Sequence, residues 1–197
     1  MLCPISPGDR DVFGEAGHVL RVPTGMQPPQ LTHTGTREFL ADVGIPVITG
    51  MPFAFPGPPW RLPPLTASVA AYEVEALGEP PVPLDRLFLL GRAVDNHLTL
   101  DGASGAVYLA DTLGGTWELV HSDLSSLTYG ICLLHKCYAR ELAAMDDAEV
   151  DGDAYVDALE EIAERVEREL ARVDGAAFEP LNSLWDAILT DVAGGIL

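Results

Sequence analysis

The stretch from residue 84 to residue 122 alternates between hydrophobic and polar positions. Its apolar runs are short, have a period of two, and are separated by turns rich in Gly, Asp and Ser. This pattern predicts an antiparallel meander of four strands. The runs are residues 87–90, 97–100, 106–110 and 117–120. The side chains expected on the core face are Phe88, Leu90, Leu98, Leu100, Val107, Leu109, Trp117 and Leu119. Those expected on a partly solvated face are His97, Thr99, Tyr108 and Glu118.

After residue 122 the apolar spacing changes to three and four, which is typical of amphipathic helices. We expect Ser122 to cap a first helix, Gly175 to end a second and Asn182 to cap a third. The first stripe is Leu124, Leu127, Ile131, Leu134, Tyr138, Leu142 and Met145. The second is Tyr155, Leu159, Ile162, Val166, Leu170 and Val173. In the third, Leu184, Trp185, Ile188, Leu189 and Val192 are expected to point inward.

The first 83 residues contain 15 of the 16 prolines and so favour loops and extended chain. One short helix is predicted over residues 37–43, capped by Thr36 and stopped by Gly44. The aromatic residues of the loop at 46–64 are expected to pack back onto the core, and a surface that binds a peptide or another partner is the alternative interpretation. The predicted fold class is therefore α+β: a meander packed against C-terminal helices, with a Pro-rich N-terminal segment wrapping the core. We expect an N-terminal extension over 1–31 and a single domain over 32–197.

Composition narrows the class of protein. The 197 residues include 30 Asp and Glu against 11 Lys and Arg, a net charge of −19, and 48% are hydrophobic. This hydrophobicity argues against wholesale disorder, and no apolar run reaches the length of a membrane span. Such negative charge repels phosphate backbones, so we expect no nucleic-acid binding and favour a basic protein partner. With no secretory signal at the N-terminus, the expected location is the cytoplasm.

Motifs that carry catalysis or bind cofactors do not occur in the sequence. It has no phosphate-binding loop, no HExxH, no CxxC pair and no GxSxG. An acid–base cluster of His97, Asp95 and Asp101 is conceivable, as is a Cys–His pair involving Cys132 and His135, but no spacing demands either one. An enzyme is therefore the weakest hypothesis, and we expect no metal and no cofactor.

The most unusual local feature is an acid-rich segment over residues 141–174. It holds 13 acidic residues and only three arginines, a net charge of −10. An EF-hand is excluded because the pattern of oxygen ligands, Gly and Glu is absent. One interpretation is a solvated helix face; the other is a surface that attracts a basic protein. The candidate contact residues are Asp146, Asp147, Glu149, Asp151, Asp153, Asp157, Glu160 and Glu164.

Three segments together resemble a known family. Residues 36–46 (TREFLADVGIP) resemble the opening helix of the SUKH-4 branch of the SUKH superfamily. Residues 98–111 (LTLDGASGAVYLAD) resemble its paired strands around a Gly-ended turn. Residues 122–127 are similar to the entry of its long helix, and residues 185–197 to its closing helix. The order and spacing of these pieces, over roughly residues 32–197, carry the resemblance.

The resemblance implies a non-enzymatic immunity protein. Such a protein binds a cognate toxin domain, often a nuclease or a nucleic-acid deaminase, and occludes its active site. An acidic protein suits that role because it can occupy a basic cleft as a mimic of phosphate. A SUKH-like scaffold or regulatory subunit of a larger protein assembly is the alternative hypothesis.

Overall fold

The computed structural model describes residues 19–47, 49–50, 52–55, 61–146, 152–179 and 183–196. The helices are α2 (Thr34–Asp42), α3 (Leu65–Ser68), α4 (Ala71–Ala76), α5 (Leu124–Asp146), α6 (Gly152–Val173) and α7 (Leu184–Ala193), with 3-10 turns η2 (Thr24–Met26), η3 (Leu84–Arg86) and η4 (Gly175–Phe178). The strands are β1 (Val19–Leu20), β2 (Ile45–Pro46), β3 (Thr49–Gly50), β4 (Phe53–Ala54), β5 (Leu87–Ala93), β6 (Asn96–Asp101), β7 (Val107–Ala110) and β8 (Trp117–His121). The predicted α+β class is confirmed.

A six-stranded antiparallel sheet in the order β3-β4-β5-β6-β7-β8 forms the centre of the fold, and β1 pairs with β2 in a separate ribbon. Strands β5 to β8 are the predicted meander. Strands β3 and β4 extend its β5 edge, where Phe53 pairs with Ala93. The sequence predicts a loop in that region, because two-residue strands carry no periodic signal.

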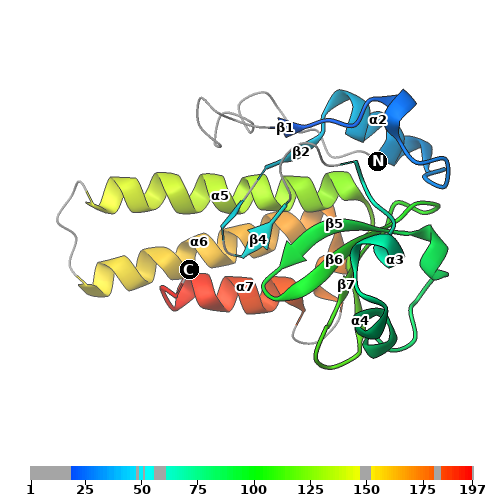
Figure 1. Cartoon of the computed structure of the whole chain (residues 1–197). Helices are drawn as coiled ribbons and strands as arrows, with labels where there is room; N and C mark the ends of the chain where they lie inside the picture. The colour runs from blue at the N-terminus through cyan, green and yellow to red at the C-terminus, as the bar shows by residue number, and fades with distance from the viewer. Residues whose placement is uncertain are drawn as a thin grey trace.

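Helices α5, α6 and α7 cover one face of the sheet. In Figure 1 they form a layer that extends beyond the sheet, with α6 between α5 and α7. The main core joins this layer to the sheet and to α2, and includes Phe88, Leu100, Ile162 and Trp185. All five residues predicted to point inward from α7 are buried, which confirms the helical stripe. In the described part of the chain, no helix has both the length and the hydropathy that crossing a bilayer requires.

The opposite sheet face was predicted to be partly solvated, and this is wrong. A second apolar cluster covers it, built from Leu65, Val69 and Leu77 of the α3–α4 region against the sheet. Thr99 on this face is fully buried. The Pro-rich N-terminal half supplies this layer, since α3 and α4 lie between the prolines and wrap the sheet on the side away from the long helices.

The predicted faces of three residues on β8, Trp117, Glu118 and Leu119, are also wrong. Leu109 pairs with Glu118 and Ala110 with Trp117, after an irregularity in register between Val107 and Tyr108. Directly paired residues share a face, so Trp117 and Leu119 lie on the side of the second cluster. Glu118 instead points to the side of the long helices. A shift of one residue reverses every side chain of a strand, which explains the error.

The predicted helix caps are displaced by one to three residues. His33 caps α2: its Nδ1 atom accepts from the Thr36 N–H at 3.3 Å. Asp123, not Ser122, accepts from the Ser126 N–H at 2.9 Å in the first turn of α5. Ser183 caps α7 in a reciprocal capping box with Asp186. Asn182, the predicted cap, lies outside the described residues.

The segment before residue 32 also contributes to the core. Leu20, Val22 and Leu31 are buried, and the Val22 N–H donates to the Leu40 carbonyl at 2.9 Å. Gly44 turns the chain back to β1 with a positive φ of 81°, where a Cβ atom would collide with the Leu20 carbonyl oxygen. The domain boundary after residue 31 stays a prediction.

Candidate functional site: an acidic groove between α6 and α7

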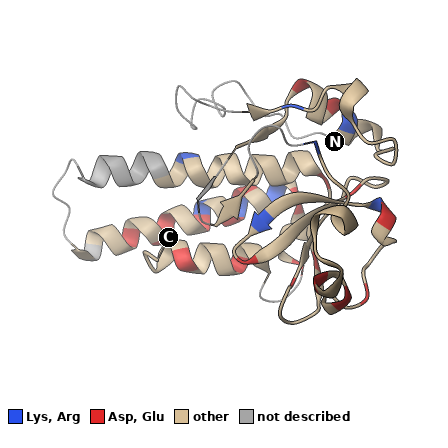
Figure 2. Ribbon diagram, in the orientation of Figure 1, with Lys and Arg blue, Asp and Glu red and all other residues tan. Residues whose placement is uncertain are grey.

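Helices α6 and α7 enclose a surface groove of about 290 Å³, here called the acidic groove. Four carboxylates and four smaller or apolar residues line it: Glu160, Glu164, Glu167, Asp186, Ala163, Leu189, Thr190 and Ala193. Figure 2 shows acidic positions on both helices. The groove therefore has acidic walls over a partly apolar floor.

The spacing of the residues on α6 explains why its carboxylates line the groove. Glu160, Glu164 and Glu167 stand at i, i+4 and i+7 and therefore share one helix face. Leu159, Ile162, Val166 and Leu170 occupy the buried face and fix the rotation of α6. Thus the same heptad-like pattern that buries one stripe holds the acidic stripe on a rigid element.

The groove carboxylates form few ion pairs with the described part of the chain. Glu164 meets Arg168 at 3.4 Å, but both side chains are about two-thirds exposed, so this pair contributes little. Among the described residues, none forms an ion pair with Glu160 or Glu167. Asp186 accepts from the Ser183 N–H at 2.9 Å as part of the α7 capping box. The groove thus keeps most of its negative charge available to solvent or to a partner.

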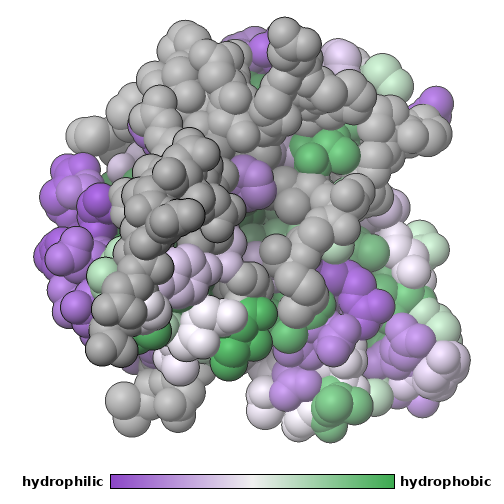
Figure 3. All heavy atoms as spheres, turned by 90° about the vertical axis from the view of Figure 1, so that its left-hand side faces the viewer, coloured by the Kyte–Doolittle hydropathy of each residue, from purple (hydrophilic) through white to green (hydrophobic). Residues whose placement is uncertain are grey.

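The predicted contact residues fall into three groups. Asp157, Glu160 and Glu164 are exposed on α6, and the last two line the groove. Asp146 ends α5 and Asp153 lies in the first turn of α6, although their side chains are outside the described residues. The other three candidates, Asp147, Glu149 and Asp151, lie wholly outside them. The view onto this end of the helices shows hydrophilic side chains gathered along one flank (Figure 3).

Sequence reasoning missed two members of the groove as contact residues. Glu167 is one of the acids of the acid-rich segment but not one of the predicted contact residues, although it continues the i, i+4, i+7 stripe. Asp186 lies on α7, beyond the acid-rich segment, and reaches the groove only because α7 packs beside α6. Helical spacing could have revealed Glu167, whereas Asp186 required the tertiary structure.

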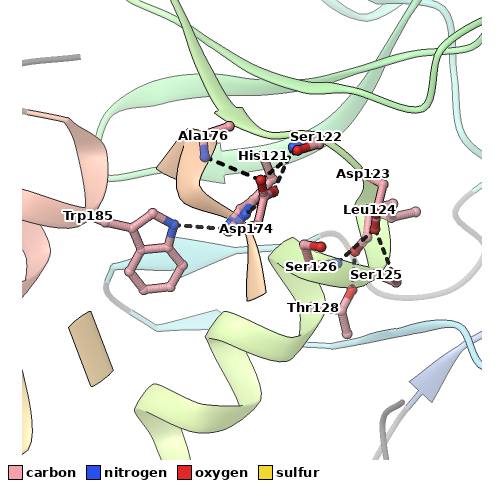
Figure 4. Close-up of polar contacts among 10 residues, drawn as sticks. All are labelled: His121, Ser122, Asp123, Leu124, Ser125, Ser126, Thr128, Asp174, Ala176 and Trp185. Atoms are coloured by element: carbon pink, nitrogen blue, oxygen red, sulfur yellow. Dashed lines mark hydrogen bonds and ion pairs between the residues drawn. The ribbon is translucent and has the colours of Figure 1, made fainter. Parts of the chain in front are cut away.

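One acid of the segment, Asp174, does not belong to a solvated surface. Its side chain is 5% exposed and connects the end of β8 to η4 (Figure 4). Asp174 Oδ2 accepts from the Ser122 N–H at 2.7 Å and lies 3.0 Å from His121 Nδ1. Its Oδ1 accepts from the Ser122 hydroxyl at 2.5 Å and from the Ala176 N–H at 3.3 Å. Asp174 therefore ties the end of β8 to the turn that follows α6.

The same network continues to α7 through His121. The Trp185 Nε1–H donates to His121 Nε2 at 2.8 Å, so the imidazole proton resides on Nδ1 and is donated to Asp174. Burial raises the pKa of Asp174, but the hydrogen bonds from His121 and Ser122 outweigh it and bring the pKa down to about 2. Because both ring nitrogens are committed and His121 is fully buried, this Asp–His pair holds the fold together.

The residues considered for catalysis, the His97–Asp101 cluster and the Cys132–His135 pair, form no common site among the described contacts. Asp101 is buried and pairs with the Arg86 guanidinium, whose Nε lies 2.9 Å from Oδ1. His97 lies under α4 at 3.7 Å from Glu73. On α5, Cys132 is buried while His135 is exposed, so the two face different surroundings. Within the described ranges, no three His, Cys, Asp or Glu side chains are grouped as metal ligands.

The fold and the groove together define an α+β protein with a row of acidic side chains on its layer of long helices. A family model described as SUKH-4 immunity protein matches residues 10–191. Since this covers most of its length, the chain belongs to the SUKH-4 immunity protein family, and the resemblance seen in the sequence is confirmed. No curated protein and no solved structure matches the chain.

Proposed function

We propose that this immunity protein binds a cognate bacterial toxin domain through the acidic groove and neutralises it without catalysis. Membership of the family supports a toxin partner. The observation that supports the groove as the contact is its four carboxylates on two packed helices, of which Glu160 and Glu167 form no ion pair with a described residue. Side chains already held on a rigid scaffold lose less entropy on binding.

The chemistry of the groove supports a basic partner. The net charge of −19 attracts a cationic protein over long range, and the groove gives this attraction a local focus. The apolar floor formed by Ala163 and Leu189 adds contact area for the aliphatic parts of Lys and Arg side chains. Charge complementarity of this kind raises association rates and selects the partner.

The charge pattern also favours a class of toxin. Enzymes that act on nucleic acid must hold phosphates, so their clefts carry Lys and Arg. A row of carboxylates on a helix can occupy such a cleft in place of phosphates and block access to it. We therefore propose a nuclease or a nucleic-acid deaminase as the toxin.

Co-expression with a candidate toxin domain, chosen from the genes that neighbour this one, tests the proposal. The wild-type chain is expected to restore growth to cells producing the toxin and to form a complex with the purified toxin domain. A groove variant combines Glu160→Gln, Glu164→Gln and Glu167→Gln. A matched control removes three charges from exposed positions outside the groove: Glu75→Gln, Glu79→Gln and Asp85→Asn. Both variants have a net charge of about −16.

The two variants separate the groove from overall charge. The groove variant is expected to protect cells less than the control does, because only it removes local complementarity. Equal protection by both variants would overturn the assignment of the groove. Failure of the wild-type chain to bind or protect against the toxin would overturn the immunity role with that partner.

A further inference from the structure

A second cavity, of about 360 Å³, lies beside the N-terminus of α7. It opens between the β5–β6 turn, the β7–β8 turn and α7, and is here called the Glu118 pocket. Six of its lining residues carry the argument: Asn96, Leu109, Asp111, Glu118, Leu184 and Ala187. The pocket thus combines apolar walls with two carboxylates, a combination suited to one long cationic side chain.

The walls of the pocket are held in place by hydrogen bonds. The Asn96 side-chain oxygen accepts from the Thr112 N–H at 3.2 Å, which joins the two turns. Asp111 Oδ1 accepts from the Leu113 N–H at 2.8 Å. On the opposite side, the Ser183–Asp186 capping box fixes the first turn of α7. The shape of the pocket is therefore set by the fold of the chain before any partner binds.

Glu118 is the more buried of the two carboxylates in the pocket. One of its oxygens accepts from the Leu184 N–H at 2.7 Å, and no basic side chain of the described residues pairs with it. Partial burial raises the pKa of Glu118; the Leu184 N–H opposes this, and the nearby charge of Asp186 adds to it. A carboxylate withdrawn from water without a cation gains most from a cationic group supplied from outside.

The Glu118 pocket and the acidic groove are neighbours along α7. Asp186 lines the groove, whereas Leu184 and Ala187, on either side of it in sequence, line the pocket. The charge of Asp186 also acts on Glu118. A basic segment lying in the groove can therefore reach the pocket with a single side chain.

We infer that the Glu118 pocket is an anchor site for one arginine side chain of the basic partner, a step that rests on the proposed function. The apolar walls formed by Leu109 and Leu184 accommodate the methylene stem. The guanidinium forms a bidentate ion pair with the Glu118 carboxylate. Arginine fits better than lysine because its guanidinium is more weakly hydrated and donates two parallel hydrogen bonds. An arginine seated in such a pocket is typical of a binding hot spot.

The proposal is tested on the full chain alone, with N-acetyl-arginine amide as the probe. Its binding is followed by shifts of backbone amide signals in NMR spectra, with N-acetyl-norleucine amide as the uncharged comparison. We expect arginine amide to shift the signals of Asn96, Glu118 and Leu184 in a saturable manner. The norleucine compound should leave them in place.

Three variants sharpen the test. Glu118→Gln keeps an oxygen for the Leu184 N–H but removes the charge, and should weaken binding about tenfold. Ala187→Leu fills the pocket from an exposed position of α7 while leaving Glu118 itself unchanged, and should also abolish the shifts. Glu75→Gln, an equal loss of charge on α4, should bind like the wild type.

Equal binding by Glu118→Gln and the wild type would overturn the proposal. So would shifts confined to the acidic groove, or equal shifts with norleucine amide. Because the probe needs no toxin, a negative result here leaves the immunity role standing. Conversely, if the chain fails to protect against the toxin, binding of arginine amide to the pocket would still be observed. The two tests can therefore fail independently of each other.

Discussion

The acid-rich segment contains two kinds of carboxylate that differ in where their partners lie. Asp174 is buried, and four hydrogen bonds from within the chain satisfy its oxygens. Glu160 and Glu167, on the preceding helix, are exposed and pair with nothing in the described chain. The same functional group, a carboxylate, thus supports the fold just after the end of α6 and stays available to a partner along the exposed face of that helix. Composition alone does not separate the two roles.

The largest expected effect is on the buried side of this comparison. Asp174→Ala should lower the free energy of unfolding by about 3 kcal/mol, because His121 and Ser122 lose a charged acceptor inside the protein. Glu164→Ala should change it by less than about 0.5 kcal/mol, the usual range for exposed positions. Urea denaturation followed by circular dichroism measures both. Similar losses for the two variants would contradict the distinction.

Acid should weaken the buried network over a defined pH range. The pKa of Asp174 is about 2 in the folded chain, against an ordinary value near 4. Because folding lowers this pKa, the stabilisation is complete above about pH 4 and is lost as the pH falls towards 2. The loss amounts to about 2 kcal/mol. Denaturation of the wild type and Asp174→Asn between pH 2 and 7 checks this.

The asparagine variant isolates Asp174 from the other acids, because it keeps their titration and removes one group. Its stability should decline less than that of the wild type between pH 4 and 2. Parallel curves would show that Asp174 does not titrate with a lowered pKa. The contribution of Glu118 to the pH dependence of stability should have the opposite sign. Because folding raises the pKa of Glu118, ionisation of this group makes folding less favourable.

A smaller effect is expected at the edge of the network. Ser122 is exposed, and its hydroxyl donates to Asp174 Oδ1. Ser122→Ala should cost about 1 kcal/mol, because solvent replaces part of the lost hydrogen bond. In the background of Asp174→Ala the same substitution should cost almost nothing, as the double-mutant cycle requires. If the two substitutions change the free energy of unfolding additively, Ser122 does not stabilise the fold through Asp174.

The smallest effect on stability is expected in the acidic groove. Glu160→Gln, Glu164→Gln and Glu167→Gln together should change the free energy of unfolding by less than about 0.5 kcal/mol, since the only ion pair lost in the described chain is exposed. Thermal unfolding of this variant beside the wild type measures the change. A loss above about 2 kcal/mol would mean that these glutamates support the fold.

Much of the fold could be predicted from the periodic spacing of apolar residues, because helices and strands depend mainly on residues that are close in sequence. The four strands, the stripe of α6 and the inward face of α7 all repeat at regular intervals, so each was predicted. The register of β8 was not, since it depends on how Val107 and Tyr108 sit opposite their partners. The burial of the second face of the sheet was not predicted either, because the helices that cover it, α3 and α4, are short and lie among prolines.

The candidate site was predicted only in part, for a similar reason. Glu160 and Glu164 emerged from the density of acids along one helix. Asp174 was grouped with them, although its burial depends on His121, which lies 53 residues earlier in the chain. Asp186 and Glu118 come from other elements and reach the groove and the pocket through packing alone. Charge counts locate a surface, but partners in space decide which carboxylates remain available.

The rate of association with the toxin domain tests the central claim most directly. Stopped-flow measurements at low salt should give a rate for the groove variant about tenfold below that of the control variant, although the two have equal net charge. The difference should shrink as salt is added, because screening weakens the attraction. Equal rates for the two variants at every ionic strength would show that overall charge, and not the acidic groove, draws the partner in.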